Sequence, residues 1–259
     1  NAFPENANQA SDDFPYAMSL QREIVFFGTG GILTAGAYYS ARRVDAPTTR
    51  EVEKLNRKNV NRFDRSATYN NSKRAEKLSY AGHYAFPVAL SLMYFDDRVR
   101  REWSTIPVMY LEGLIICNMG ITDLTKNIVQ RKRPYLYNTD LSVQERVDKG
   151  VDGKSSFFSG HTSFNFYSAT FLTKVFWDMN PDSGYRYLVA GSTYAIASFV
   201  GYMRYKAGKH YPTDILVGAV VGALIGYTVP SLHHDNNHEM TISPLMDGNS
   251  YGLILSFNL

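Results

Sequence analysis

The first residues whose types and spacing suit chemistry are the cations between 126 and 134. Lys126 and Arg133 are seven residues apart, so a helix places them on one face two turns apart, and Pro134 disfavours helix at Arg133. Two cations that converge from one face suit a multiply charged anion such as phosphate, because Arg binds it with a fork of donors and Lys as a point charge. A basic helix end that balances the macrodipole, or a positive flank beside a membrane, is the alternative interpretation.

A second group is the Ser-Gly-His run just before an apolar helix. Ser159 or Thr162 can cap the start of that helix, and Gly160 lets the backbone approach a ligand closely. Free N–H groups at a helix start bind anions, and His161 would stand beside such an anion as a proton donor. An ordinary capped helix with an exposed histidine is the alternative.

The third group is Arg204, His210 and Asp214. If residues 210–214 are helical, His210 and Asp214 lie at positions i and i+4 on one face, and Pro212 at the helix start would also hold them near one another. A carboxylate on one imidazole nitrogen fixes the tautomer and leaves the other nitrogen free to attack. A surface His–Asp pair is the alternative.

Together and in this order, the three groups resemble the signature of the type 2 phosphatidic acid phosphatase superfamily. This superfamily includes class A bacterial acid phosphatases and vanadium-dependent haloperoxidases, and its signature reads K-x6-RP, PSGH and SR-x5-H-x3-D. The resemblance covers roughly residues 75–232, and two positions depart from it, with Phe158 in place of Pro and Met203 in place of Ser. The nine matching positions are Lys126, Arg133, Pro134, Ser159, Gly160, His161, Arg204, His210 and Asp214.

The resemblance implies a metal-independent phosphomonoester hydrolase that forms a phosphohistidine. It assigns the nucleophile to His210, its orientation to Asp214, and protonation of the leaving alcohol to His161. No metal and no cofactor are implied, because guanidinium and ammonium groups neutralise the phosphate. The implied phosphate-binding residues are Lys126, Arg133, Ser159, Gly160 and Arg204.

The substrate is expected to be a small or lipid phosphate. A vanadate-dependent haloperoxidase is one alternative. A catalytically silent bundle that binds lipids or anions is another, and only Phe158 and Met203 support it.

Composition limits the class of protein. The chain has 259 residues, of which 44% are hydrophobic and 20% charged, with a formal net charge of +3. These values exclude a disordered chain, and the single Cys117 excludes a disulfide scaffold. A net charge this small predicts no nucleic-acid partner. We expect one phosphatase domain over residues 1–259, and the oligomeric state is left open.

The elements that must position these residues are helices. Most of the six apolar stretches, at 24–41, 78–95, 106–121, 162–173, 187–203 and 215–229, are shorter than a membrane span needs, and the mean hydropathy is −0.26. We therefore expect an all-α bundle of about six core helices with buried apolar faces, exported to the periplasm. The first residue, Asn1, is consistent with a sequence that begins within a longer chain or with a targeting segment that has been removed, and export assumes the second. The alternative is an integral membrane protein with six spans and an extracytoplasmic active site.

Outside the apolar stretches, the sequence divides into an N-terminal arm, a basic segment, a polar loop and a C-terminal tail. Residues 1–20 form a polar arm, and the basic segment 42–77 contains a solvated amphipathic helix within 49–62 or contacts a membrane surface. Residues 135–154 form a polar loop. The tail 233–259 ends in a short β-hairpin, with strands at 241–244 and 251–257. His233, His234 and His238 are assigned to a solvated tail rather than to a metal site.

Overall fold

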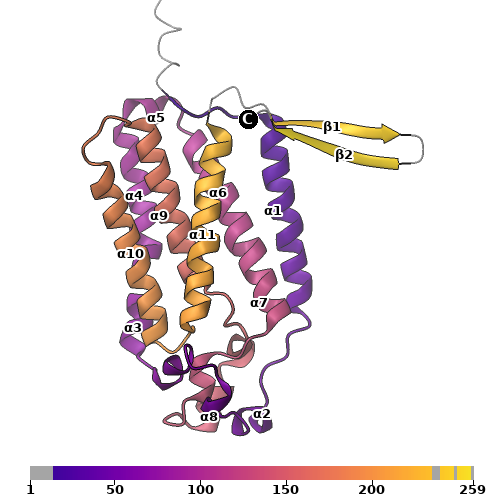
Figure 1. Cartoon of the computed structure of the whole chain (residues 1–259), viewed down its shortest axis with the longest axis vertical. Helices are drawn as coiled ribbons and strands as arrows, with labels where there is room; N and C mark the ends of the chain where they lie inside the picture. Colours follow the sequence, from indigo (N-terminus) through magenta and orange to yellow (C-terminus); the bar gives the residue numbers. More distant parts are fainter. Residues whose placement is uncertain (1–13, 235–239, 248–249, 258–259) are drawn as a thin grey trace, which may run out of the picture.

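Long helices that lie side by side make up most of the structure, a computed structural model that describes residues 14–234, 240–247 and 250–257 (Figure 1). The mostly helical fold class is confirmed. In the described part of the chain, six helical rods run the length of the bundle, and the third continues from α6 through a π-helix at Ile115–Thr122 into α7. The rods are α1 (Leu20–Ala41), α4 (Ala81–Leu92), α6 (Thr105–Leu114) with α7 (Asp123–Val129), α9 (Gly160–Met179), α10 (Arg186–Lys206) and α11 (Pro212–His233).

Helix α9 is the central rod. Apolar and small polar side chains surround its axis, which is the pattern of a helix buried on all sides. Tyr167, Phe171 and Val175 of α9 pack against Ile106 of α6 and Val229 of α11 in the main hydrophobic core. This core holds the first turns of α9 and α11 at the same end of the bundle.

Three glycines bring α11 against α9. Gly218, Gly222 and Gly226 lie four residues apart on one face of α11. A Cβ atom on Gly222 would stand 2.1 Å from the carbonyl oxygen of Ser163, and one on Gly226 would stand 2.4 Å from that of Tyr167. Only residues without a side chain allow two helix backbones to approach this closely. The apolar run at 215–229 is therefore a packing face on this side.

The outer faces of the helices remain apolar, which differs from the expectation that these faces are buried. Along α11, the side chains of Leu216, Val220 and Leu224 point outward and are 56%, 59% and 62% exposed. Among the described residues, three helical segments are long and apolar enough to cross a bilayer, namely Leu20–Ala41, Thr105–Tyr137 and Pro212–His233. The mean hydropathy of the chain does not reveal these apolar faces, because the polar segments 42–77 and 135–154 lower the average.

The basic segment 42–77 is not one amphipathic helix. Helix α2 (Thr49–Glu53) begins at a capping box between Thr48 and Glu51 and ends at Glu53. Short turns at Arg57–Asn59 and Arg65–Tyr69 follow, and then α3 (Lys73–Leu78). The predicted amphipathic helix over 49–62 is therefore wrong, because the helix ends at Glu53 and the chain continues in short turns.

This segment and the polar loop together form a cap, defined here as residues 49–78 and 134–154. The loop folds into turns at Pro134–Tyr137 and Gly150–Lys154 on either side of α8 (Val143–Val147). Arg57 Nε donates a hydrogen bond to the carbonyl oxygen of Tyr137, at 3.1 Å. Figure 1 shows α2 and α8 together at the lower end of the bundle, with the short α5 (Asp97–Arg101) at the opposite end.

The first described residues and the two C-terminal strands lie at the end of the bundle opposite the cap (Figure 1). Residues 1–13 of the expected arm fall outside the described residues, whereas Phe14 and Tyr16 are buried and belong to the core instead of a polar arm. After α11, the backbone follows two antiparallel strands, β1 (Met240–Asp247) and β2 (Ser250–Phe257), with Met240 opposite Phe257. The strands project from the bundle (Figure 1), and an isolated two-stranded hairpin is marginally stable in water. The predicted hairpin is therefore not supported as a stable element of the fold.

Candidate active site

The three sequence groups meet at the cap end of the bundle. Lys126 lies in the last turn of α7, Arg133 just beyond that helix, and Arg204 in the last turn of α10. His161 is in the first turn of α9, and Asp214 is in the first turn of α11. Segments that are remote along the chain therefore contribute side chains to one region beneath the cap.

His210 is buried in the loop between α10 and α11. Its Nδ1 lies 2.7 Å from the carbonyl oxygen of Ser156, so Nδ1 carries the proton and donates it. Its Nε2 therefore has a free lone pair and lies 3.1 Å from Nη1 of Arg133. Burial lowers the pKa of His210 well below its usual value, and the cations Arg133, Arg204 and Lys126 lower it further. The ring is neutral, which is the form that a nitrogen nucleophile requires.

Asp214 does not hydrogen-bond His210. His210 precedes α11, which begins at Pro212, so the two residues do not share a helix face, and Oδ2 of Asp214 is 3.8 Å from Nδ1 of His210. Oδ2 instead accepts hydrogen bonds from Ser156 Oγ at 2.5 Å and from the backbone N–H of Tyr211 at 2.9 Å. Since the carbonyl of Ser156 holds His210, the carboxylate reaches the imidazole through this serine.

Two of the predicted anion-binding cations flank the start of α9. Lys126 Nζ lies 3.0 Å from the position that a Cβ atom on Gly160 would take, so this glycine makes room for the ammonium group. Arg204 is 4% exposed, donates from Nη1 to Ser79 Oγ at 3.3 Å, and has no hydrogen-bond partner for Nε among the described residues. A buried guanidinium with an unused N–H donor is suited to bind an anion.

Arg133 is the most firmly held of the cations. Its Nε donates to the carbonyl of Asp152 at 2.8 Å, and its Nη2 pairs with the carboxylate of Asp152 at 2.7 Å. Its Nη1 also donates to the carbonyl of Lys209 at 3.0 Å, next to His210. The guanidinium is therefore fixed beside the lone pair of His210.

Ser159 is the residue that caps α9. Its Oγ accepts hydrogen bonds from the backbone N–H of Thr162 at 3.3 Å and from Thr162 Oγ1 at 2.8 Å, and the side chain is buried. These hydrogen bonds from Ser159 fix the start of α9 with its first N–H groups beside Lys126, as expected for an anion site. Contact of Ser159 itself with phosphate stays a prediction.

His161 faces a hydrophobic and cationic surrounding. The centroid of its ring is 4.6 Å from that of His83, and its Nε2 is buried without a hydrogen-bond partner among the described residues. The residue lies outside the three candidate spans. Burial lowers the pKa of His161 to about 2, and Arg204 and His83 contribute by charge repulsion. The imidazole is therefore neutral until an anion arrives.

Two cavities meet at Lys126. One has a volume of about 260 Å³ and is lined by His83, Lys126, Gly160 and His161, by Asn118 and Asp123 of the third rod, and by apolar side chains of that rod and α9. The other has about 470 Å³ and extends from Lys126 and Arg133 to Thr34 and Ala37 of α1. His210 lines neither of these two cavities, since Arg133 stands in front of its Nε2.

Several residues that contact the site were not predicted from the sequence. Arg131 makes ion pairs with Asp214 and, at 2.7 Å, with Asp64, so the cap helps to hold the start of α11. Asp64 is buried and also accepts hydrogen bonds from the backbone and hydroxyl of Thr213. Arg131 stands in the basic run already noticed, whereas nothing in the sequence signals Asp64. Ser156 and His83 likewise follow no spacing rule.

The two departures from the signature do not disturb these contacts. Phe158 is buried, with its ring centroid 6.0 Å from that of Phe157. Met203 is half-buried on α10, one residue before Arg204. Neither replaces a side chain that makes the hydrogen bonds described above.

The comparisons with known proteins agree with the signature. The sequence matches the PAP2 superfamily over residues 107–238. A probable diacylglycerol pyrophosphate phosphatase 1 of Schizosaccharomyces pombe is 35% identical over 165 residues, which are 53% of this chain and 58% of that protein. A lipid A 4′-phosphatase of Porphyromonas gingivalis is 25% identical over 142 residues, covering 55% and 57% of the two chains.

Phospholipid phosphatase 2 of Rattus norvegicus is 31% identical over 132 residues, or 42% of this chain and 46% of that protein. The chain thus spans about half the length of the curated relatives it matches. Among solved structures, that of Aquifex aeolicus LpxE is 23% identical, covers 61% of this chain and 83% of its own, and has a TM-score of 0.42. On the match over residues 107–238 and the signature within it, the chain belongs to the PAP2 superfamily.

Proposed function

We propose that this chain is a lipid phosphate phosphatase in which His210 carries the phosphoryl group. The observation that carries the proposal is the convergence of Lys126, Arg133 and Arg204 beside a neutral imidazole with a free Nε2 lone pair. A phosphomonoester dianion repels nucleophiles, so cations must neutralise it before attack. Preorganised charge of this kind contributes about 3–4 kcal/mol per well-placed donor in enzymes.

The reaction has two steps. Nε2 of His210 attacks phosphorus, the bond from phosphorus to the ester oxygen breaks, and the leaving alkoxide takes a proton from His161. Water then attacks the phosphohistidine, and His161 accepts its proton, which returns His210 as free base and releases phosphate. His161 is neutral in the unbound site, because burial and the neighbouring cations lower its pKa, so it takes up a proton from solvent when the bound dianion offsets those cations, and this proton serves the first step.

Asp214 acts in this proposal as a positioning residue. Its contacts with Ser156 and with Arg131 fix the start of α11 and the carbonyl that orients His210. The orientation of the nucleophile thus depends on a chain of contacts that runs from Asp64 in the cap to the imidazole.

The lipid character of the substrate follows from the cavity beside α1. Its polar end holds Lys126 and Arg133, and its other end holds Thr34, Ala37 and Tyr38 on a helix with apolar outer residues. An alkyl group attached to the phosphate fits this route. The relatives named as phosphatases of phospholipid, lipid A and diacylglycerol pyrophosphate support the same class.

We further propose that the bundle is an integral membrane domain, in place of the exported, non-spanning form favoured by the hydropathy. The apolar outer faces and the three candidate spans support this. With six rods, the cap and the site lie at one surface, opposite the start of α1 (Figure 1). An extracytoplasmic position of that surface is the arrangement that the resemblance implies, and the C-terminal hairpin would then lie at the opposite surface.

A substitution in the cavity wall tests the lipid assignment. Thr34→Trp fills the α1 end of the cavity, whereas Thr29→Trp adds the same bulk to an exposed position of the same helix. Phosphate release from phosphatidic acid in detergent micelles should fall at least tenfold in Thr34→Trp only, with glycerol 3-phosphate hydrolysis unchanged in both. Equal activity of all three proteins on phosphatidic acid would refute the route, and no phosphate release by the unsubstituted chain from either compound would refute the function.

A further inference from the structure

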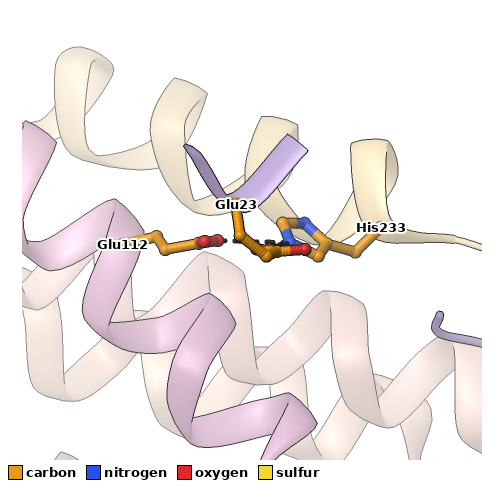
Figure 2. Close-up of side chains that lie close together, drawn as sticks. All are labelled: Glu23, Glu112 and His233. Atoms are coloured by element: carbon orange, nitrogen blue, oxygen red, sulfur yellow. Dashed lines mark hydrogen bonds and ion pairs between the residues drawn. The ribbon is translucent and has the colours of Figure 1, made fainter. Parts of the chain in front are cut away.

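A second group of titratable side chains lies at the end of the bundle opposite the cap. Glu23 is in the first turn of α1, Glu112 is in α6, and His233 is the last residue of α11. One ligand atom from each lies within 4.8 Å of the others, and Figure 2 shows the three side chains pointing toward one another. His233 is fully buried, so its assignment to a solvated tail is wrong. Its burial follows from the continuation of α11 to residue 233.

The two ring nitrogens of His233 face a backbone carbonyl on one side and the two carboxylates on the other. Nδ1 lies 2.8 Å from the carbonyl oxygen of Val229 and therefore donates its proton there. Nε2 then stands 3.3 Å from Glu23 Oε2 and 3.2 Å from Glu112 Oε2. A neutral imidazole in this position would place a lone pair against two anions, so a positive species must lie between them. A backbone carbonyl that accepts the other ring N–H in this way is typical of metal-binding histidines.

Glu112 supplies an independent observation. The residue is 0% exposed, and neither of its carboxylate oxygens accepts a hydrogen bond among the described residues. A buried carboxylate without such partners is costly unless a cation compensates it. Arg22, the neighbouring cation, donates to the carbonyl oxygens of Leu232 and Ala17 and contacts Glu23 only at 3.5 Å. The carboxylate of Glu112 thus points into the cluster without a guanidinium partner.

We propose that Glu23, Glu112 and His233 bind one divalent first-row transition-metal ion. Around a tetrahedral Zn²⁺ with ligand bonds of about 2.1 Å, neighbouring ligand atoms are about 3.4 Å apart. The two N–O separations of 3.3 and 3.2 Å match this edge. One imidazole with two carboxylates suits Zn²⁺ or Mn²⁺ better than Ca²⁺, which takes six to eight oxygens.

The ion would tie three helices together. It joins α1, α6 and α11 at the end of the bundle remote from the candidate active site, so its role is structural. The proposal does not depend on the proposed phosphatase function, because none of the three residues contacts the cap or its cations.

Zinc binding to the full chain tests the proposal. The protein is stripped with a chelator in detergent, and Zn²⁺ binding is followed by calorimetry and by elemental analysis. We expect one Zn²⁺ per chain with a Kd below about 1 μM, and at least 100-fold weaker binding in Glu112→Gln, which keeps the shape of the side chain. His234→Ala is the matched control, since it removes the adjacent histidine outside the cluster and should bind like the unsubstituted chain.

Thermal unfolding provides a second readout. The measurement on the unsubstituted chain alone tests the proposal, even if a variant fails to fold. The Tm of the stripped chain should rise when Zn²⁺ is added and fall again with chelator, while the Tm of Glu112→Gln should respond to neither. No bound zinc and no shift of Tm in the unsubstituted chain would mean that a proton alone bridges the cluster, and this would overturn the proposal. Loss of zinc binding in His234→Ala with retention in Glu112→Gln would overturn it as well.

Discussion

The two ends of the bundle place buried histidines in opposite electrostatic surroundings. Beneath the cap, His210 has cations around it and only a backbone carbonyl as acceptor, so it stays neutral with a free lone pair. At the other end, the Nε2 of His233 faces the carboxylates of Glu23 and Glu112, where a positive species is required. Both histidines donate Nδ1–H to a backbone carbonyl. In the two proposals, the charges opposite Nε2, and not the residue type or the helix end, therefore decide whether the ring serves as a nucleophile or as a ligand.

Substitution at the two ends should have very unequal effects on turnover. His210→Ala should reduce kcat on phosphatidic acid by at least about 10³-fold, because the group that accepts phosphorus is lost. Glu112→Gln should change kcat less than about threefold at temperatures below its Tm. Steady-state phosphate release measures both, and a large loss of kcat in folded Glu112→Gln would show that the two ends are not separate.

The glycine face of α11 should matter to both ends equally. Gly222→Ala places a methyl group 2.1 Å from a backbone carbonyl of α9, so the two helices must separate, and we expect a loss of at least about 3 kcal/mol in stability. Gly191→Ala, in the interior of α10 with open space around it, should be neutral or stabilising by up to about 1 kcal/mol. Thermal unfolding in detergent compares the two, and equal Tm values would contradict the close packing.

The link through Ser156 should have a smaller effect on turnover. Ser156→Ala keeps the backbone carbonyl that holds His210 but removes the hydroxyl that binds Asp214. We expect kcat to fall about tenfold with KM nearly unchanged, since positioning rather than substrate binding is impaired. The pH at which activity is half-maximal should also shift. Unchanged kcat and pH profile would mean that Asp214 positions His210 by another route.

The smallest expected effect concerns stability in acid. The pKa of His161 is lowered to about 2 from an ordinary value near 6.5, so between these values the unfolded chain binds a proton that the folded chain does not. Stability should therefore fall as pH decreases below about 6.5, by at most about 1.4 kcal/mol per pH unit from this group. His161→Gln should lose less Tm than the unsubstituted chain between pH 6.5 and 5. Equal losses of Tm in the two proteins would mean that groups other than His161 cause the loss of stability in acid.

The spacing of residues in the sequence predicted many of the side chains at the cap-end site. Helical periodicity and each part of the signature relate residues that are close together in the sequence. The apolar stretch at 187–203 lies within α10, and the placement of Lys126, Arg133, Arg204 and the two histidines beneath one cap follows from the order of the helices. The contacts of Asp64 and Ser156 could not be predicted, since they depend on how the cap folds back over the site. His233 was misassigned for a related reason. Its partners are Glu23 and Glu112, each more than a hundred residues away, so no local pattern joins them.

Trapping the covalent intermediate tests the central claim most directly. The full chain in detergent is mixed with phosphatidic acid carrying labelled phosphate, quenched in base within one turnover, and digested for mass spectrometry. The account predicts a phosphoryl group on His210, absent from His210→Ala and present in Glu112→Gln. Release of phosphate with no label on His210, or with label on another residue, would contradict it.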